Sequence, residues 1–349
     1  MKILYLYIKK HKSVRLGTGR MVKLLIVKMK PMMCVFGLQK IRTLCSMARP
    51  SPLRRAVLYV PGDDLRKLNK ARSLDADCIA MDCEDGVASN RKKNARDNIR
   101  SLLDEGSILQ LPSEWCVRVN SVESGLCEED LSAVLGGDRT PPTLLLPKVE
   151  STDHVRWFSD RISSALRGRS SKIDLVLYIE SARAVLRLPD ICAKAEELSR
   201  ASLFRPAALV FGSDDLCASL GVTRTTEANE LLYARQKLVL VAKAFGLQAI
   251  DMVHIEYQDL EGLRRQCEAG AGMGYTGKQV IHPAQVPVAQ AAFLPAPASV
   301  QRARAVVEAF RRHQAEGKGA FTYEGSMIDM PTVLQARRVL EVATSAKNK

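Results

Sequence analysis

Charged residues follow short apolar runs at several points along the chain, and their types suit one kind of chemistry. The acidic clusters are residues 82–86 (Asp-Cys-Glu-Asp-Gly) and 213–215 (Ser-Asp-Asp), and other runs are followed by Arg118, Lys148 and Glu180. Carboxylate oxygens are the ligands that Mg²⁺ prefers, and cationic side chains beside them suit an anionic substrate. One such acid can equally cap the helix that follows. As a set, these residues predict a hard-cation site that faces an anionic substrate.

For these residues to meet, the apolar runs must lie side by side. Near-continuous apolar runs are typical of parallel strands that are covered on both faces. Amphipathic sequence lies between them, for example over residues 226–245. Eight such units over roughly 230 residues predict an α/β fold, a (β/α)8 TIM barrel, rather than an open doubly wound sheet. The expected strands are 56–60, 78–81, 116–119, 143–146, 175–179, 207–211, 249–255 and 279–281. In such a barrel the active groups lie at the carboxyl ends of the strands, where the charged residues fall.

The net charge of +14 is concentrated at the beginning of the chain. Residues 1–62 contain fourteen of the 52 Lys and Arg and no acid, so the remainder has 38 basic residues against 38 acidic ones. Residues 1–50 mix Lys and Arg with apolar residues, which is typical of a mitochondrial targeting segment and predicts a matrix protein. A disordered basic arm, a mispredicted start site and an RNA-binding arm are the alternatives. With a neutral body and no long apolar run, we expect neither nucleic acid nor membrane as partner.

Other chemistries find little support in the sequence. The nine cysteines are odd in number and form no C-x-x-C pair, which indicates reduced, mostly buried thiols in an intracellular protein. No G-x-S-x-G nucleophile motif occurs. Residues 272–278 match a phosphate-binding P-loop, but Gln279 stands where Ser or Thr should follow, and the match precedes a predicted strand. We expect the glycines of residues 270–274 to form a tight entry into the last strand.

The motifs together resemble one known family. They are Tyr59-Val-Pro-Gly62, Asp82-Cys-Glu-Asp-Gly86, Arg118-Val-Asn120, Leu146-Pro-Lys148, Phe211-Gly-Ser-Asp-Asp-Leu216 and Gly277-Lys-Gln-Val-Ile-His-Pro283. In this order they resemble the citrate lyase β-subunit-like (HpcH/HpaI aldolase) family, with coverage from about residue 54 to the end. The resemblance implies a homotrimer of Mg²⁺-dependent TIM barrels that cleave or form C–C bonds next to a CoA thioester.

The resemblance also implies roles for individual residues. Glu180 and Asp215 match the metal ligands, with Asp215 preferred to its neighbour Asp214 because it directly precedes Leu216 in the motif. Arg118 matches the guanidinium that grips the substrate carboxylate, and it counts with Asp329 as catalytic. Asp329 lies in an arm that would fold over a neighbouring subunit's barrel and deliver a general acid. The residues expected around the acyl-CoA substrate are Tyr59, Arg66, Lys70, Arg118, Ile281 and His282.

These expectations define the domains and the reaction. We expect a leader over residues 1–50, a catalytic barrel over 51–298 and a C-terminal helical arm over 299–349. The resemblance implies cleavage of (3S)-citramalyl-CoA to pyruvate and acetyl-CoA. The first alternative keeps the site but favours malyl-CoA, with thioester hydrolysis or condensation of glyoxylate with acetyl-CoA. The second is a non-catalytic barrel scaffold, which the complete set of Glu180, Asp215, Arg118 and Asp329 disfavours.

Overall fold

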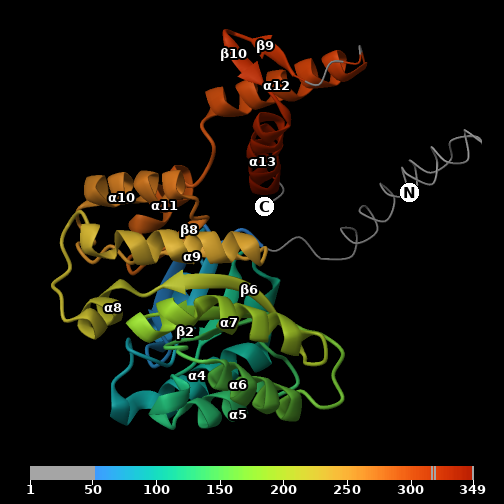
Figure 1. Ribbon diagram of the computed structural model, residues 1–349. Coiled ribbons are helices and arrows are strands. Elements are labelled where there is room, and N and C mark those ends of the chain that lie inside the picture. Colours follow the sequence, from blue (N-terminus) through green and yellow to red (C-terminus); the bar gives the residue numbers. More distant parts are fainter. Residues whose placement is uncertain (1–51, 316, 318–319, 348–349) are drawn as a thin grey trace, which may run out of the picture. The chain divides into compact units, whose positions relative to one another are not determined.

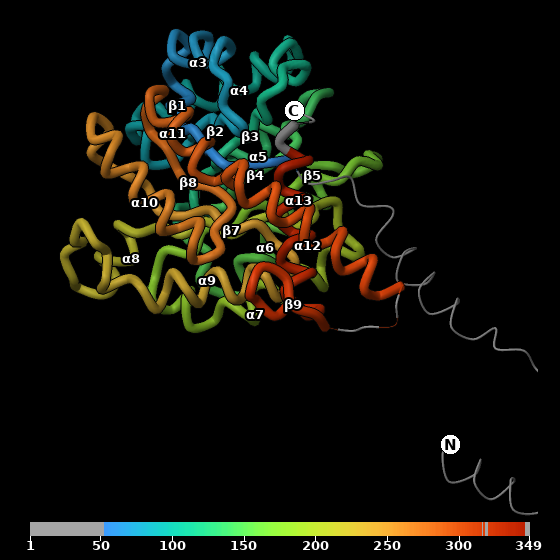
Figure 2. The backbone as a smooth tube through the Cα atoms, turned by 90° about the horizontal axis from the view of Figure 1, so that it is seen from above, coloured from blue at the N-terminus to red at the C-terminus, as the bar shows by residue number. Residues whose placement is uncertain are grey.

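The computed structural model describes residues 52–315, 317 and 320–347. Eight parallel strands close into a barrel in chain order, from β1 beside β2 round to β8 beside β1 (Figures 1 and 2). They are β1 (Ala56–Pro61), β2 (Cys78–Asp82), β3 (Glu114–Arg118), β4 (Thr143–Leu146), β5 (Ile173–Ile179), β6 (Phe204–Phe211), β7 (Gln248–Asp251) and β8 (Gly277–Val280). The predicted TIM barrel is confirmed, and each expected strand overlaps an observed one.

Helices surround this barrel, as Figure 2 shows from above. They are α3 (Leu65–Ala71), α4 (Lys92–Glu105), α5 (Cys127–Leu135), α6 (Thr152–Ala165), α7 (Ala182–Ser199), α8 (Ser213–Leu220), α9 (Leu232–Ala244), α10 (Leu260–Met273) and α11 (Gln285–Ala292). The amphipathic stretch at 226–245 contains α9, preceded by a short 3-10 turn, Asn229–Leu231. Its buried positions include Leu238, Val239 and Ala242, at the spacing of one helical face.

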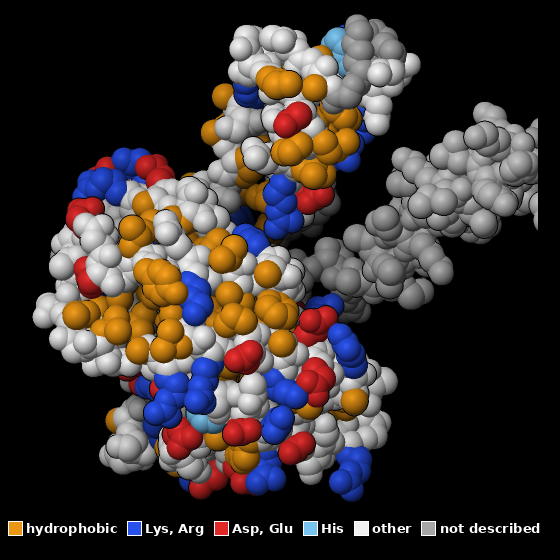
Figure 3. All heavy atoms as spheres, in the orientation of Figure 1, with side chains coloured by type: hydrophobic (Ala, Val, Ile, Leu, Met, Phe, Trp, Pro, Cys, Tyr) orange, Lys and Arg blue, Asp and Glu red, His pale blue; other side chains and the backbone are white. Residues whose placement is uncertain are grey.

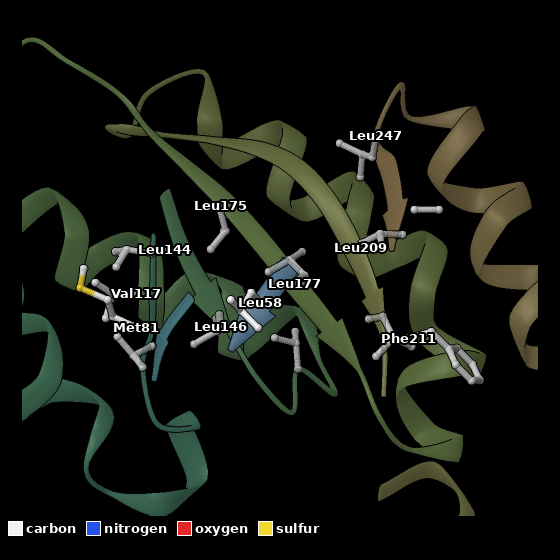
Figure 4. Close-up of a cluster of buried hydrophobic side chains, with 14 of the residues drawn as sticks. Leu58, Met81, Val117, Leu144, Leu146, Leu175, Leu177, Leu209, Phe211 and Leu247 are labelled. Carbon is white, nitrogen blue, oxygen red and sulfur yellow. The ribbon is translucent and has the colours of Figure 1, made fainter. Parts of the chain in front are cut away.

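Side chains alternate between the two faces of each barrel strand, and this alternation builds both the core and the site. Outward-facing residues pack between the strands and the helices, among them Met81, Val117 and Leu177 (Figure 4). Inward-facing residues, such as Cys116 and Tyr178, fill the barrel. The same period of two turns the polar side chains at the strand ends toward the barrel axis.

The C-terminal residues form a small unit with apolar packing of its own. It consists of α12 (Pro297–Ala315), the antiparallel hairpin of β9 (Phe321–Tyr323) and β10 (Ser326–Ile328), and α13 (Met330–Lys347). Val307 and Phe310 of α12 cluster with Ile328 and with Val333 of α13. The predicted helical arm is therefore present, with a β-hairpin between its two helices.

Two details of the sequence prediction are wrong. The strand expected over 249–255 ends at Asp251, because the neighbouring β8 pairs with β7 only through Ile250 and Asp251. The glycines at 270 and 272 belong to α10 rather than to a tight strand entry, and only Gly274, at φ 103°, caps that helix in a left-handed conformation.

Several further expectations can be compared with the structure. The seven cysteines that the structure describes are all free and buried, as predicted. Within the described residues, no helix is both long enough and apolar enough to cross a membrane. The expected leader, residues 1–50, lies outside the described part of the chain.

One face of the barrel carries exposed apolar side chains. Figure 3 shows hydrophobic side chains gathered over α7 and α9. Leu186 of α7 is 70% exposed, and Tyr233 and Leu240 of α9 are 69% and 71% exposed. An extended apolar patch on a protein surface commonly marks a protein–protein contact.

Candidate active site

Three charged side chains form the uppermost inward layer of the barrel, and a tyrosine lies just below them. The alternation that turns Ala80, Cys116 and Tyr178 inward also turns the residues two positions later inward. These residues are Asp82, Arg118 and Glu180, and the tyrosine is Tyr59 of β1. Asp82 is 1% exposed, Arg118 9% and Glu180 7%, so the charges lie beneath the rim and away from bulk water.

Arg118 is held rigidly by its neighbours. Its Nε and Nη2 donate to the two oxygens of Asp82, each at 2.7 Å. Its Nη1 lies 2.9 Å from Glu84 Oε2, and the guanidinium stacks 4.7 Å from the ring centre of Tyr59. The side of the guanidinium that could hold a carboxylate with two hydrogen bonds is therefore occupied by Asp82, and Nη1 is the atom that a ligand could reach by replacing Glu84.

Glu180 is a buried carboxylate without a cationic side chain as hydrogen-bond partner among the described residues. Its Oε2 accepts a hydrogen bond of 2.8 Å from the backbone N–H of Lys148. Burial, and then the negative charges of Glu84 and Asp215, raise the pKa of Glu180 to about 8. Gly212 makes room for it, since a Cβ there would lie 2.3 Å from the Glu180 side chain. Such a carboxylate is poised to accept a cation.

The two acids that sequence reasoning had to distinguish, Asp214 and Asp215, have different partners. Both lie in the first turn of α8. Asp214 is paired with Arg224 at 3.0 Å. Asp215 lies 3.5 Å from Lys148 Nζ, and its charge acts on Glu180. The structure thus brings Asp215, rather than Asp214, into the environment of Glu180.

Glu84 and Lys148 complete the charged cluster. Lys148 Nζ donates to Glu84 Oε1 at 2.7 Å and to Asp85 Oδ1 at 3.3 Å. Burial raises the pKa of Glu84 to about 7, although the charge of Arg118 opposes this shift. Burial alone would lower the pKa of Lys148, but its hydrogen bond to Glu84 and the charge of that carboxylate raise it above its usual value.

With all of its carboxylates ionised, the cluster carries more negative than positive charge. The raised pKa values of Glu84 and Glu180 mean that protons offset this excess when no cation is present, and a bound cation would replace them, which is the main argument for a cation site. The five carboxylates are Asp82, Glu84, Asp85, Glu180 and Asp215, and the two cations are Arg118 and Lys148. Among the described residues, no group of three or more His, Cys, Asp or Glu is arranged as a metal cage. Mg²⁺ does not need one, because it is usually held by one or two carboxylates and keeps several waters. Glu180 and Asp215 therefore fit this ion.

A directed hydrogen-bond chain lies directly below the charges. Gln279 Nε2 donates to the carbonyls of Phe211 (2.9 Å) and Asp251 (3.2 Å), which leaves its Oε1 to accept from the Tyr59 hydroxyl at 2.9 Å. Tyr59 has a single hydroxyl proton, so its hydrogen bond with Tyr178 must be donated by Tyr178. The hydroxyl of Tyr59 is thus engaged in two hydrogen bonds, and the residue contacts Arg118 through the face of its ring.

The other residues expected around the substrate lie at the rim. Arg66 and Lys70 are exposed and four residues apart on α3. Beside α3 is an open cavity of about 490 Å³, lined by residues of the loops after β1 and β2 such as Asp63 and Arg91. Ile281 and His282 are exposed, but their backbone N–H groups donate to Gln285 and are therefore not available to a ligand.

Asp329 has a local role in its own chain. Its Oδ1 accepts from the backbone N–H of Thr332 at 3.1 Å and from the Thr332 hydroxyl at 2.8 Å. The backbone hydrogen bond, followed by that of the hydroxyl, holds the pKa of Asp329 below its usual value. Within one copy of the chain, its described hydrogen bonds are those of a helix N-cap at the start of α13.

Sequence reasoning missed several members of this site. Glu84 and Lys148 were recognised as rim residues but were given no role. Asp82 was not expected to hold Arg118, and Gln279 was considered only in the P-loop comparison. Tyr178 could have been found, because it lies on β5 two residues before Glu180, which directly follows the strand, and the alternation gives both the same inward direction.

The barrel segment of the chain matches a known protein family. Residues 55–283 match the HpcH/HpaI aldolase/citrate lyase family. The chain belongs to this family. The match begins at β1 and ends just after β8, so it covers the whole barrel and the charged cluster around Glu180, but not Asp329.

Individual family members give a finer comparison. The mitochondrial citramalyl-CoA lyase of Homo sapiens is 48% identical over 299 residues, which cover 85% of this chain and 87% of that protein. A (3S)-malyl-CoA thioesterase of Cereibacter sphaeroides is 31% identical over 85% of this chain and 97% of that protein. Among solved structures, CitE of Mycobacterium tuberculosis in complex with magnesium, acetoacetate and coenzyme A is 29% identical, with a TM-score of 0.66, and the match covers 85% of this chain and 100% of that one.

Proposed function

We propose that the chain is a Mg²⁺-dependent carbon–carbon lyase that cleaves (3S)-citramalyl-CoA to pyruvate and acetyl-CoA. The observation that carries this proposal is the charge-imbalanced cluster around Glu180 in a chain 48% identical to a mitochondrial citramalyl-CoA lyase. The family relative with magnesium and coenzyme A supports the same cofactor and substrate class.

The carboxylates of Glu180 and Asp215 would hold the cation. When bound, Mg²⁺ supplies Lewis-acid stabilisation of the negative charge that develops on substrate oxygens. Arg118, fixed by Asp82 and by the ring of Tyr59, would hold the substrate carboxylate through Nη1. Because Asp82 prevents the guanidinium from turning, this contact is preorganised and costs little reorganisation during the reaction. Arg66 and Lys70 offer positive charge to the phosphates of the CoA.

A direct assay tests the proposal. The purified chain is given citramalyl-CoA and malyl-CoA in parallel, once with Mg²⁺ and once with EDTA. We expect acetyl-CoA and pyruvate to be released from citramalyl-CoA only with Mg²⁺. A folded, Mg²⁺-binding protein that releases neither product would contradict the lyase and leave the scaffold alternative.

A second candidate activity is malyl-CoA chemistry, either thioester hydrolysis or glyoxylate condensation. The relative named (3S)-malyl-CoA thioesterase, 31% identical over 85% of the chain, favours it. The two substrates differ by one methyl group, and a contact of that size discriminates by only about 1–3 kcal/mol. We therefore expect both substrates to react, and the ratio of their kcat/KM values decides which activity is primary.

The catalytic unit is proposed to be a homotrimer in which Asp329 of one copy serves the barrel of another. Its support is the exposed apolar surface of α7 and α9 and the equally exposed Met327, 75% accessible, beside Asp329. In that setting Asp329 would protonate the acetyl-CoA enolate and would act as base in the reverse direction. Asp329→Asn is expected to keep Mg²⁺ binding and to lose about 10²- to 10⁴-fold in turnover.

Complementation separates a shared site from a local one. Asp329→Asn and Glu180→Gln subunits are each expected to be nearly inactive alone. Co-expressed in one oligomer, they should regain about a quarter of wild-type turnover, because an intact barrel then meets an intact arm by chance. No recovery in mixed oligomers would contradict the shared site, while the lyase proposal would stand on the assay above.

The proposed location is the mitochondrial matrix. It is supported by the basic, acid-free segment over residues 1–50 and by relatives from three mammals that are named as mitochondrial. Residues 1–50 fused to a fluorescent protein should direct it into mitochondria, and a diffuse signal would contradict this assignment.

A further inference from the structure

Lys148 has an unusual backbone conformation for its residue type. It follows Pro147 at the end of β4, and its φ is 53°, in the left-handed region. Only two other non-glycine residues in the described part of the chain, Ala228 and Glu324, have positive φ. A lysine has no intrinsic preference for this region, and such conformations persist where the surroundings impose them, often at functional sites.

This conformation directs two different groups of Lys148 into the charged cluster. The backbone N–H donates to Glu180 Oε2 at 2.8 Å. The ammonium lies 2.7 Å from Glu84, 3.3 Å from Asp85 and 3.5 Å from Asp215. One residue therefore contacts both carboxylates that we assign to the cation, Glu180 through its main chain and Asp215 through its side chain.

The second cation of the cluster cannot take over this task. The Nε and Nη2 of Arg118 are engaged by Asp82, and its Nη1 lies against Glu84. The charge that Asp215 meets at close range is therefore that of Lys148. The Lys148 side chain is 35% exposed, so the ammonium can leave the carboxylates for solvent without a rearrangement of the barrel.

We propose that Lys148 is a positioning residue whose ammonium holds the acidic cluster together and competes with the divalent cation for Asp215. This inference rests on the proposed Mg²⁺ site. A positive charge beside a carboxylate weakens the binding of any other cation to it, whether a proton or a metal ion. For protons, a neighbouring opposite charge within about 4–6 Å changes the affinity of a carboxylate by about 10- to 1,000-fold. Lys148 would thus keep Mg²⁺ binding weak enough to be reversible while maintaining the site's geometry.

The inference predicts opposite effects on metal affinity and on stability. Lys148→Met removes the ammonium and keeps the N–H that supports Glu180. Mg²⁺, titrated calorimetrically into the EDTA-treated full chain, is expected to bind this variant about tenfold more tightly than wild type. In EDTA the variant should unfold at a lower temperature, because its carboxylates repel one another. Saturating Mg²⁺ should remove most of that difference, since the bound ion supplies the missing charge.

Three further variants make the test specific. Lys148→Arg keeps the charge and should bind Mg²⁺ nearly as wild type does. Lys93→Met removes an exposed lysine of α4 that is paired with Asp97, and it should change neither affinity nor the effect of EDTA. Lys148→Asn also removes the charge, and it tolerates positive φ better than methionine. It replaces Lys148→Met if that variant does not fold.

The outcomes separate this inference from the function on which it rests. Unchanged or weaker Mg²⁺ binding in the charge-removing variants would overturn the competition. So would a loss of stability that Mg²⁺ does not repair, because that pattern belongs to a purely structural lysine. If wild type itself binds no Mg²⁺, both the proposed metal site and this inference fall together, and the calorimetric titration of wild type reveals this directly.

Discussion

The two ends of the barrel both contain buried clusters of acids and cations, but only one of them is balanced. At the amino ends of the strands, the acids Glu114, Asp174 and Asp77 are paired with Arg54, Arg205 and Arg55. At the carboxyl ends, five carboxylates share Arg118 and Lys148. In TIM barrels the first end generally serves stability and the second carries chemistry. The difference in charge balance shows how one fold separates these tasks.

The cluster at the amino ends of the strands, called the lower cluster here, is also tightly hydrogen-bonded and buried around Arg54. Arg54 is 1% exposed, and it donates to both oxygens of Glu114, at 2.6 and 2.7 Å, and to Asp174 at 3.1 Å. Its Nη1 has no hydrogen-bond partner among the described residues but is buried, so the cluster presents no accessible Arg54 charge to a ligand. At the upper end, by contrast, Glu180 has no cationic side chain as hydrogen-bond partner among the described residues, so its carboxylate can bind a cation.

The largest effect is expected from Glu180→Gln at the upper end. The change removes one of the two proposed cation ligands, and Lewis-acid stabilisation is worth several kcal/mol, or roughly a thousandfold in rate. The stability of the fold should not decrease, because the variant also removes a buried carboxylate that no cationic side chain among the described residues hydrogen-bonds. Steady-state turnover and thermal unfolding in EDTA test both parts. Retained turnover would break the comparison, because it would make the unbalanced cluster irrelevant to catalysis.

Arg54→Met tests the lower end and should have the reverse signature. It leaves Glu114 and Asp174 buried with less positive charge, and losing one partner of a buried ion pair costs about 3–5 kcal/mol. Denaturant unfolding should show this loss, while turnover per folded molecule stays near wild type. Arg264→Met, on an exposed helix surface, serves as the control and should change stability little. If Arg54→Met reduced turnover per folded molecule more than it reduced stability, the division of tasks between the two ends of the barrel would be contradicted.

The sequence predicted the fold, and the positions of Arg118 and Glu180 at the strand ends, better than the partners of these side chains. Eight apolar runs were sufficient for the barrel, and the strand ends located Arg118 and Glu180, because these depend on local pattern alone. The bidentate hold of Asp82 on Arg118 depends on the register between β2 and β3, which sets these two residues side by side. The reach of Lys148 depends on a left-handed residue that no local signal indicated. Such features come from tertiary structure, so they appear only when the strands are assembled.

A smaller effect concerns the pH dependence of stability at the upper end. The pKa of Glu180 is raised to about 8, so the folded chain binds a proton more tightly than the unfolded chain does. The stability that this proton binding contributes is fully present below the usual pKa of a glutamate, and it is lost as the pH rises through about 8. In EDTA, the free energy of unfolding should therefore decline between about pH 5 and pH 8, by at most about 1.4 kcal/mol per pH unit for this one group. The unfolding temperature should decline with it. Glu180→Gln should flatten this slope, and an unchanged slope would assign it to other groups.

The smallest effect is expected below the charges, where the Tyr178 hydroxyl donates to Tyr59. Tyr178→Phe removes one hydrogen bond, worth about 1 kcal/mol, and allows the Tyr59 ring beneath Arg118 to shift. Because Arg118 would still be held by Asp82, we expect a several-fold rise in KM with kcat nearly unchanged. Tyr275→Phe, which removes a hydrogen bond to the Arg235 carbonyl outside the cluster, is the matched control and should leave KM unchanged. Equal effects of the two variants on KM would show that the hydrogen bonds from Tyr178 through Tyr59 to Gln279 only stabilise the barrel. The residues that act on the substrate would then begin above Tyr59.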